Sequence, residues 1–220
     1  MKKILIKTLA LCFVISIMLS TTCFARTVTT ITVTTTPPLY SKFVDVLTTD
    51  WFCSYVNAMA EAGIVNGYPG NVFKPNNNVT RAELAKIMAV AAGLDTPKPT
   101  QQIFDDVGID QWYAPYVHAT KDYFPEMTDE DGNVCFDPNE YAGREDVAMA
   151  VAKIKGLSAG AEGDVQTRFS DDADISPEAK TYIAAAVDAG IVYGYEDGTF
   201  KPRGAITRAE LATVCCRAFS

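Results

Sequence analysis

Apolar residues recur with the period of an α-helix at several places along the chain. After position 80 they follow one another at intervals of three and four residues, which places them on one helical face: Leu84, Ile87, Met88 and Ala91. Two stretches open on a threonine followed three residues later by a glutamate, the spacing of a capping box: Thr80 with Glu83, and Thr207 with Glu210. The pattern predicts a helix that begins just after each threonine.

A second type of helix is predicted ahead of each of these. Ser176 has the character of an N-cap, Pro177 suits the first helical position, and Glu178 places an acid in the first turn. An apolar stripe follows and ends at a glycine: Tyr182, Ile183, Ala186, Val187 and Gly190. The corresponding helices are expected over 51–62 and 112–122. The segment between the two helices of each pair is expected to be a turn with two or three extended residues.

The helix pairs belong to an internal repeat. Residues 62–85 and 189–212 are identical at 15 of 24 positions without a gap. A weaker copy lies between them. One arginine follows the N-cap position of each copy, at spacings of 63 and 64 residues: Arg81, Arg144 and Arg208. The chain is therefore divided into three helix–loop–helix units, called units one, two and three below: 43–93, 104–157 and 169–220.

A single unit of about 60 residues buries too little apolar surface to be stable alone. Three units can share one core, so we expect a mainly α protein in which they pack as a pseudo-threefold bundle. Unit two is divergent, since Gly143 and Asp146 stand where the other units have the threonine and glutamate of the capping box. Unit three departs in another way, because Glu178 occupies the position of Trp51 and Trp112.

The first residues are expected to be an export signal rather than part of the fold. Three lysines precede an apolar run over 8–19 and a small-x-small site that ends at Ala25, which is typical of a secretory signal peptide over 1–25. This run is shorter than the roughly 20 residues that span a membrane, and no membrane span is expected once the signal is removed. Residues 26–40 are rich in threonine and proline, and they are expected to form either one short strand or a flexible spacer.

The charge of the chain excludes several classes of partner. The 220 residues carry a formal net charge of −8, which becomes −11 without the three lysines of the signal, Lys2, Lys3 and Lys7. No run of Lys and Arg offers a basic face for nucleic acid. With a single histidine, His118, and no familiar nucleophile or metal motif, the sequence predicts no enzyme, metal site or cofactor. The acidic loop 129–133 lacks the flanking acids that an EF-hand calcium loop requires.

Four cysteines remain after the signal: Cys53, Cys135, Cys215 and Cys216. Export permits disulfides, and the adjacent pair at 215 and 216 cannot easily bond to itself. We favour the alternative that Cys53, Cys215 and Cys216 are small buried side chains on helices.

The motifs of the repeat, taken together, resemble the S-layer homology family. The pattern is Phe-x-Asp-Val, an aromatic residue eight positions later, Gly-Ile-x-x-Gly-Tyr, Asp-Gly-Thr-Phe-x-Pro and Ile-Thr-Arg-Ala-Glu, and it extends over 43–220. The resemblance implies a three-lobed, mainly helical prism that anchors exported proteins non-covalently to the bacterial cell wall. It implies a secondary cell-wall polysaccharide, often with a ketal-linked pyruvate, as the ligand. It also implies a ligand contact by the arginine of each unit, at grooves between lobes: Arg81, Arg144 and Arg208.

The residues themselves support a carboxylate site at each arginine. A cation in the first turn opposes the helix dipole, so folding is expected to gain nothing from it, whereas a guanidinium beside open backbone N–H groups can bind an anion. The alternative is an ion pair with an acid of a neighbouring unit, such as Asp45, Asp106 or Asp171. Trp51 and Trp112 are expected either to stack on a sugar or to anchor the first helix in the core. The capping residues complete the candidate site: Thr80, Glu83, Thr207 and Glu210.

The sequence therefore predicts a secreted, non-catalytic protein of the bacterial cell wall, cell surface or S-layer. Its predicted ligand is an anionic cell-wall polysaccharide or a peptidoglycan-linked polymer. Because units two and three depart from the pattern, at most two grooves are expected to function. The alternatives are lateral self-assembly into a surface array and an adaptor that binds another surface protein.

Overall fold

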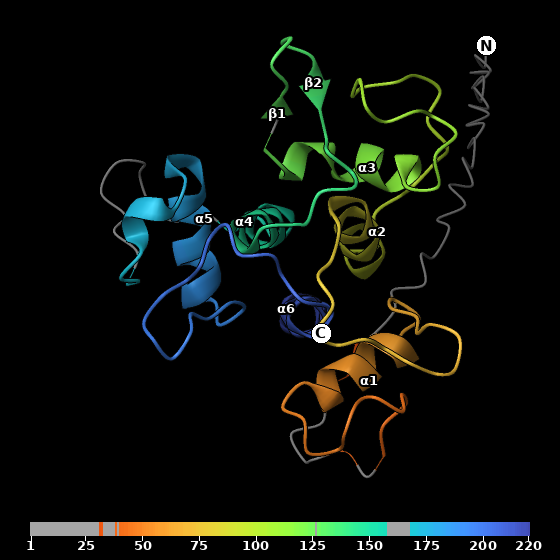
Figure 1. Cartoon of the computed structure of the whole chain (residues 1–220), viewed down its shortest axis with the longest axis vertical. Coiled ribbons are helices and arrows are strands. Elements are labelled where there is room, and N and C mark those ends of the chain that lie inside the picture. The colour runs from red at the N-terminus through yellow and green to blue at the C-terminus, as the bar shows by residue number, and fades with distance from the viewer. Residues whose placement is uncertain (1–30, 33–37, 39, 126, 158–167) are drawn as a thin grey trace, which may run out of the picture.

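The structure is a computed structural model that describes residues 31–32, 38, 40–125, 127–157 and 168–220 (Figure 1). Within these residues the fold is mainly helical, as predicted. The helices are, in chain order, α1 (Cys53–Glu61), α2 (Arg81–Ala91), α3 (Ala114–Thr120), α4 (Arg144–Ile154), α5 (Pro177–Asp188) and α6 (Arg208–Phe219). The other described elements are two 3-10 turns and one antiparallel hairpin: η1 (Lys121–Tyr123), η2 (Asp172–Asp174), β1 (Met127–Thr128) and β2 (Val134–Cys135).

Both predicted capping boxes are confirmed. The Thr80 hydroxyl accepts a hydrogen bond from the Glu83 backbone N–H at 3.3 Å, and the Glu83 carboxylate accepts one from the Thr80 N–H at 3.0 Å. Thr207 and Glu210 exchange the same two bonds at 3.3 and 2.9 Å. Helices α2 and α6 therefore begin where the sequence indicates.

The other helix ends differ slightly from the prediction. In unit two, the Asp146 carboxylate accepts a hydrogen bond from the Gly143 N–H at 3.2 Å. Because glycine has no side chain, the second hydrogen bond of a capping box is missing at this helix start. Helix α1 begins two residues after Trp51, and α3 begins two residues after Trp112 and ends at Thr120, where η1 takes over. Each tryptophan thus lies in the turn that leads into its helix rather than on the helix.

The three second helices, α2, α4 and α6, lie together at the centre of the molecule, and α1, α3 and α5 lie outside them (Figure 1). Each inner helix packs against the outer helix of the following unit, so that α2 contacts α3 and α4 contacts α5. Helix α6 at the end of the chain packs against α1 at its beginning. Each unit therefore packs against the next, and the contact between α6 and α1 joins unit three to unit one and completes the ring of three units.

The same turn follows the first helix in all three units and is held by the aspartate two residues after the motif phenylalanine, in Phe-x-Asp-Val of units one and two and in Phe-x-Asp-Asp of unit three. The Asp45 carboxylate accepts from the backbone N–H groups of Phe73 and Lys74, both at 2.7 Å. Asp106 and Asp171 hold the equivalent turns with bonds of 2.7–2.8 Å. This carboxylate stabilises a residue with positive φ in each turn: Lys74, Asp137 and Lys201. The phenylalanine beside it is among the largest fully buried side chains: Phe73, Phe136 and Phe200.

The amino-terminal predictions fall mostly outside the described residues. The proposed signal peptide over 1–25 lies there entirely, and so does most of the segment 26–40. Of that segment, Ile31 is buried in the core at 3% exposure and belongs to no strand. Among the described residues, no helix is long and apolar enough to cross a membrane.

The hairpin loop that links β1 to β2 is closed by its own aspartate. The Asp129 carboxylate accepts from the Asn133 side-chain amide at 2.8 Å and from the backbone N–H groups of Asn133 and Asp131 at 2.9 and 3.0 Å. These bonds hold the pKa of Asp129 below its ordinary value. The loop is thus an Asx-type turn in which hydrogen bonds within the loop occupy the Asp129 carboxylate.

The four cysteines of the described chain are unpaired and buried, as favoured for three of them: Cys53, Cys135, Cys215 and Cys216. Burial raises the pKa of Cys216 to about 12 and raises that of Cys215 further.

We expect these thiols to resist a thiol-labelling reagent at neutral pH in the folded protein and to react fully in concentrated urea. Rapid labelling of any of them in the folded state would contradict the burial seen here.

Candidate ligand-binding grooves

Among the described residues, the side chain of each repeat arginine forms hydrogen bonds with a neighbouring unit and not with its own. The Nε–H of Arg81 donates to the carbonyl of Phe136 at 2.6 Å, that of Arg144 to Phe200 at 2.9 Å, and that of Arg208 to Phe73 at 2.8 Å. The guanidinium also lies over the ring of the same phenylalanine, at 4.5–5.2 Å from the centroid. The arginines therefore join unit one to two, two to three, and three to one.

The backbone N–H groups at the starts of the inner helices are also occupied by the neighbouring unit. Arg81 and Ala82 donate to the carbonyls of Glu140 and Pro138 at 2.8 and 3.0 Å. The same pairs of bonds recur at the starts of α4 and α6, at 2.9–3.0 Å. The expectation of open N–H groups at these helix starts is wrong, because the packing of the units uses them. A ligand contact by the arginine side chain stays a prediction.

The alternative, an ion pair with an acid of a neighbouring unit, is confirmed for Arg81 and Arg144, but with other acids than the three that the sequence suggested. Asp45, Asp106 and Asp171 bind backbone N–H groups of the turns, and none forms an ion pair with a repeat arginine. The acids that do pair come from the inner helices: Arg81 with Asp146 at 3.0 Å, and Arg144 with Glu210 at 3.2 Å.

Arg208 differs from the other two. Its Nη2 donates to the carbonyl of Asn66 at 3.0 Å, and among the described residues no carboxylate lies within ion-pairing distance of it. Glu83, which corresponds to Asp146 and Glu210, forms no such pair. The positive charge of Arg208 is therefore not neutralised by an ion pair, although the side chain is only 8% exposed.

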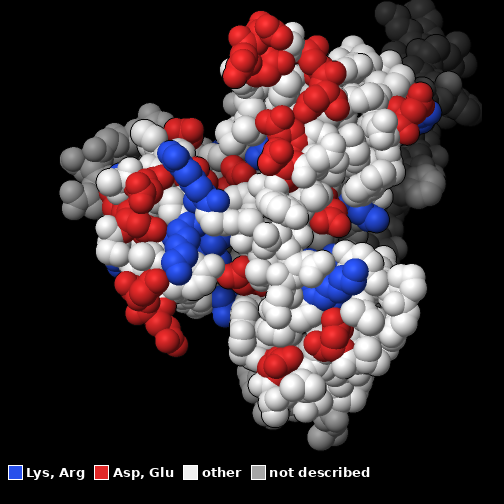
Figure 2. Space-filling model, viewed as in Figure 1, with Lys and Arg blue, Asp and Glu red and all other residues white. Residues whose placement is uncertain are grey.

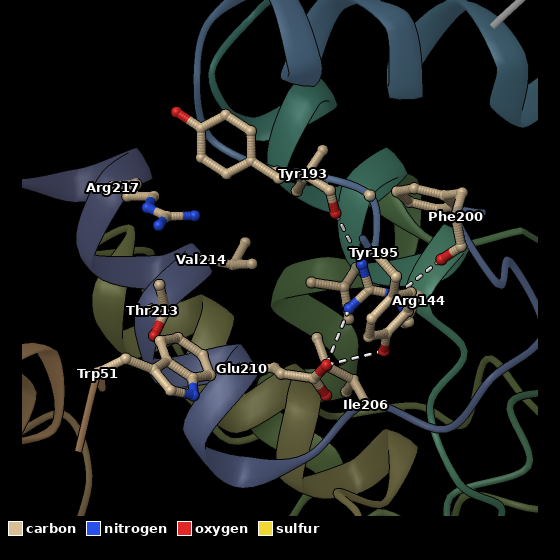
Figure 3. Close-up of a pocket in the computed structure, with 13 residues that line it drawn as sticks. Trp51, Arg144, Tyr193, Tyr195, Phe200, Ile206, Glu210, Thr213, Val214 and Arg217 are labelled. Carbon is tan, nitrogen blue, oxygen red and sulfur yellow. Dashed lines mark hydrogen bonds and ion pairs between the residues drawn. The ribbon is translucent and has the colours of Figure 1, made fainter. Parts of the chain in front are cut away.

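A groove with a volume of 240 Å³ opens beside Arg144, and we call it the Arg144 groove (Figure 3). All three units contribute to it: Trp51 from unit one, Arg144 from unit two, and the loop and α6 of unit three. Its lining also includes Tyr193, Tyr195, Glu210 and Arg217. The Tyr195 hydroxyl donates to Glu210 at 2.8 Å. Burial raises the pKa of Tyr195, which keeps it a donor at neutral pH.

A second groove, of 180 Å³, lies beside Arg208 and is called the Arg208 groove. Its lining includes Tyr68, Glu83, Lys86 and Trp112. The shift of 127 residues that relates units one and three superposes Tyr68 on Tyr195, Glu83 on Glu210 and Lys86 on Thr213. The two grooves are thus equivalent places in the repeat, each with an arginine, a tyrosine, a glutamate and a tryptophan.

The position of the tryptophans settles one alternative. Trp51 is 62% exposed and Trp112 is 54% exposed, so the alternative in which they anchor the core is wrong. Each indole meets the next residue edge to face, Trp51 with Phe52 at 5.2 Å and Trp112 with Tyr113 at 5.3 Å. An exposed aromatic ring held in this way beside a groove is a surface for an apolar ligand face.

The arginine of unit one is enclosed instead. Arg81 is 3% exposed, and its guanidinium lies 5.8 Å from the ring of Phe124 and 5.0 Å from that of Phe136. Its Nη2 has no hydrogen-bond partner among the described residues. Phe124 belongs to the stretch that replaces Gly-Ile-x-x-Gly-Tyr in unit two, and it is itself buried. Arg81 lines neither the Arg144 groove nor the Arg208 groove.

Some of the remaining candidate residues only cap a helix, and others also line a groove. Glu83 and Glu210 cap their helices and also face the grooves, whereas Thr80 and Thr207 cap only and line neither groove. Sequence reasoning missed two cations that line the grooves, Lys86 and Arg217. Their positions, three and seven residues beyond the glutamate on α2 and α6, share its helical face and could have indicated them.

These features define a class of repeat protein in which helix–loop–helix units interlock through the same turn and the same arginine. The family model "S-layer homology domain" matches the chain at residues 42–85 and 168–212, within units one and three. The chain is therefore a member of the S-layer homology family. Unit two is not matched, although it has the same helix pair and the same turn.

Several curated proteins are similar over most of the chain. A cellulosome-anchoring protein of Acetivibrio thermocellus is 34% identical over 159 residues, 68% of this chain and 34% of that protein. The S-layer protein sap of Bacillus anthracis is 29% identical over 77% of this chain and 20% of its own length. An amylopullulanase of Thermoanaerobacterium thermosulfurigenes is 30% identical over 80% of this chain and 9% of its own length. The chain thus spans at most about a third of these relatives.

Proposed function

We propose that this chain is a non-catalytic anchoring module of the bacterial cell surface that binds an anionic secondary cell-wall polysaccharide. The observation that carries the proposal is the pair of equivalent grooves, each with an exposed tryptophan beside cationic side chains. The proposal includes units one, two and three as tandem S-layer homology repeats arranged as a threefold prism. The names of the relatives, a cellulosome-anchoring protein and S-layer proteins, support a place at the cell surface.

The chemistry of the grooves suits a polymer of sugars that carry carboxylates. The indole offers an apolar face for a sugar ring, and a guanidinium or ammonium group nearby offers charge-assisted hydrogen bonds to an acid such as a ketal-linked pyruvate. Two cations and one carboxylate line each groove: Arg144, Arg217 and Glu210, and Arg208, Lys86 and Glu83.

The attraction for such a ligand is local rather than general. The chain has a formal net charge of −8, and Figure 2 shows acidic side chains gathered over the lobe of α3 and the hairpin. The protein as a whole therefore repels an anionic polymer, and binding must depend on short-range contacts in the grooves. The predicted signal peptide and secretion complete the proposal.

Co-sedimentation with cell walls tests the proposal. Purified protein is mixed with walls that retain their secondary polysaccharide and with walls from which it has been extracted. We expect the protein to pellet with the first and to remain in solution with the second, and to lose binding when the ketal pyruvate is removed by mild acid. Equal pelleting with both walls, or with neither, would contradict the proposed ligand.

A further inference from the structure

We propose that Arg217, held between two tyrosines, is the side chain that binds the acidic group of the polysaccharide in the Arg144 groove. This inference rests on the proposed function and assigns a subsite within it. The repeat arginine of this groove, Arg144, is then a structural residue that forms the wall of the site.

The donors of Arg144 are already used. Its Nε–H donates to Phe200, its Nη1 to Glu210 at 3.2 Å, and its Nη2 to the carbonyl of Tyr193 at 2.9 Å. The rings of Tyr195 and Phe200 lie 4.5 and 5.2 Å from its guanidinium. An incoming carboxylate would have to displace Glu210, which is itself fixed by the capping box and by Tyr195. Arg144 is therefore a poor anion site.

Arg217 has the opposite properties. It lies in the last turn of α6 and is half-buried, and among the described residues it has neither a carboxylate nor a hydrogen-bond partner. Its guanidinium lies 4.6 Å from the ring of Tyr193 and 5.4 Å from that of Tyr55. These ring contacts fix the position of the side chain and leave its five N–H donors available, which lowers the entropy cost of binding.

The two arginines lie on opposite sides of the groove, and the Trp51 indole lies below Arg217 in the view of Figure 3. Arg217 is seven residues beyond Glu210 on α6, which corresponds to about 10 Å along the helix. A ligand whose carboxylate binds Arg217 therefore avoids repulsion by the Glu210 carboxylate, while one of its sugar rings can contact Trp51.

The Arg208 groove lacks this subsite. At the positions equivalent to Arg217 and Tyr193 it has Val90 and Asn66, and its second cation is Lys86, at the position of Thr213. Lys86 is one helical turn nearer the capping box, about 6 Å along the axis. The second cation therefore lies at a different position along the helix in each groove, and we expect the two grooves to bind the acidic group of the ligand in different positions.

Calorimetric titration with pyruvylated secondary cell-wall polysaccharide tests the assignment. The Arg208 groove is first disabled by Trp112→Ala with Lys86→Gln, so that binding reports the Arg144 groove. In this background Arg217→Gln is expected to weaken binding by about tenfold to a hundredfold, the value of one charge-assisted contact. Arg217→Lys should weaken it less, and Arg203→Gln, at an exposed arginine outside both grooves, should change nothing.

The outcomes separate the two proposals. If the unaltered protein binds no polysaccharide, the proposed function fails and the subsite with it. If the unaltered protein binds but Arg217→Gln binds as tightly as its parent, or the parent background does not bind, only the subsite is wrong. A gain-of-function variant guards against a folding defect: Asn66→Tyr with Val90→Arg should build the subsite in the Arg208 groove and tighten binding there.

Discussion

Replacing Arg81 by alanine is expected to lower the free energy of unfolding by about 3–5 kcal/mol, the cost of removing one partner of a buried ion pair. The variant leaves Asp146 without its cation and the Phe136 carbonyl without its donor, both at the junction of units one and two. Removing a 3% exposed side chain also leaves a cavity beside two phenylalanine rings. The loss is expected although the arginine lines neither groove.

Urea unfolding followed by circular dichroism measures this effect. Arg208→Ala is the graded comparison, because within the described part of the chain Arg208 binds two backbone carbonyls but no carboxylate. Its removal should cost about 1–3 kcal/mol. Arg203→Ala is the matched control, since Arg203 is exposed, and it should stay within about 0.5 kcal/mol of the parent. An Arg81→Ala variant as stable as the control would show that the arginine bonds between units add nothing.

This result bears on how wall-binding experiments with arginine variants are interpreted. A protein whose repeat arginine is removed can lose wall binding because the units separate, without any loss of a ligand contact. Because α6 closes the fold on α1, weakening one junction weakens the geometry of both grooves, each of which draws on three units. Groove variants must therefore be chosen among side chains that form no hydrogen bond or ion pair between described residues of different units.

The local rules of the sequence were sufficient for the starts of the inner helices. Thr80 with Glu83 and Thr207 with Glu210 located two helix starts, because a capping box depends on residues three apart. The repeat located a third start at Arg144 even though Gly143 weakens the cap. Such features are short-range, and a single sequence contains all of the information that they need.

The role of the repeat arginines depends on long-range contacts, and sequence reasoning gave an ion pair with a neighbouring unit only as an alternative and did not identify the acids. Arg208 donates to Phe73, which lies 135 residues earlier, and no local pattern indicates that partner. The same interlocking brings Trp51 of unit one into the same groove as Arg144 of unit two. The helix-dipole argument treated the N-terminal N–H groups as open, whereas carbonyls of the next unit occupy them. The spacing of motifs therefore predicted the elements but not which unit completes each groove.

Replacing both tryptophans by alanine is expected to abolish most wall binding without unfolding the protein. An aromatic anchor at the centre of a binding site is worth about 2 kcal/mol or more, which is about thirtyfold in affinity for each groove. Since Trp51 and Trp112 are 62% and 54% exposed, the free energy of unfolding should change by only about 0.5 kcal/mol each. Co-sedimentation and urea unfolding of the same preparations measure the two quantities.

The single variants make this test sharper than the double one. If both grooves bind, Trp51→Ala and Trp112→Ala should each leave the other groove intact, and only the double variant should lose the wall. Tyr141→Ala is the control, because Tyr141 is 59% exposed but lines neither groove. Full binding by the double variant would place the ligand elsewhere on the protein. Loss of binding with one single variant would mean that one groove carries the affinity, and the contrast between Lys86 and Arg217 would then identify the cation position that the polymer requires.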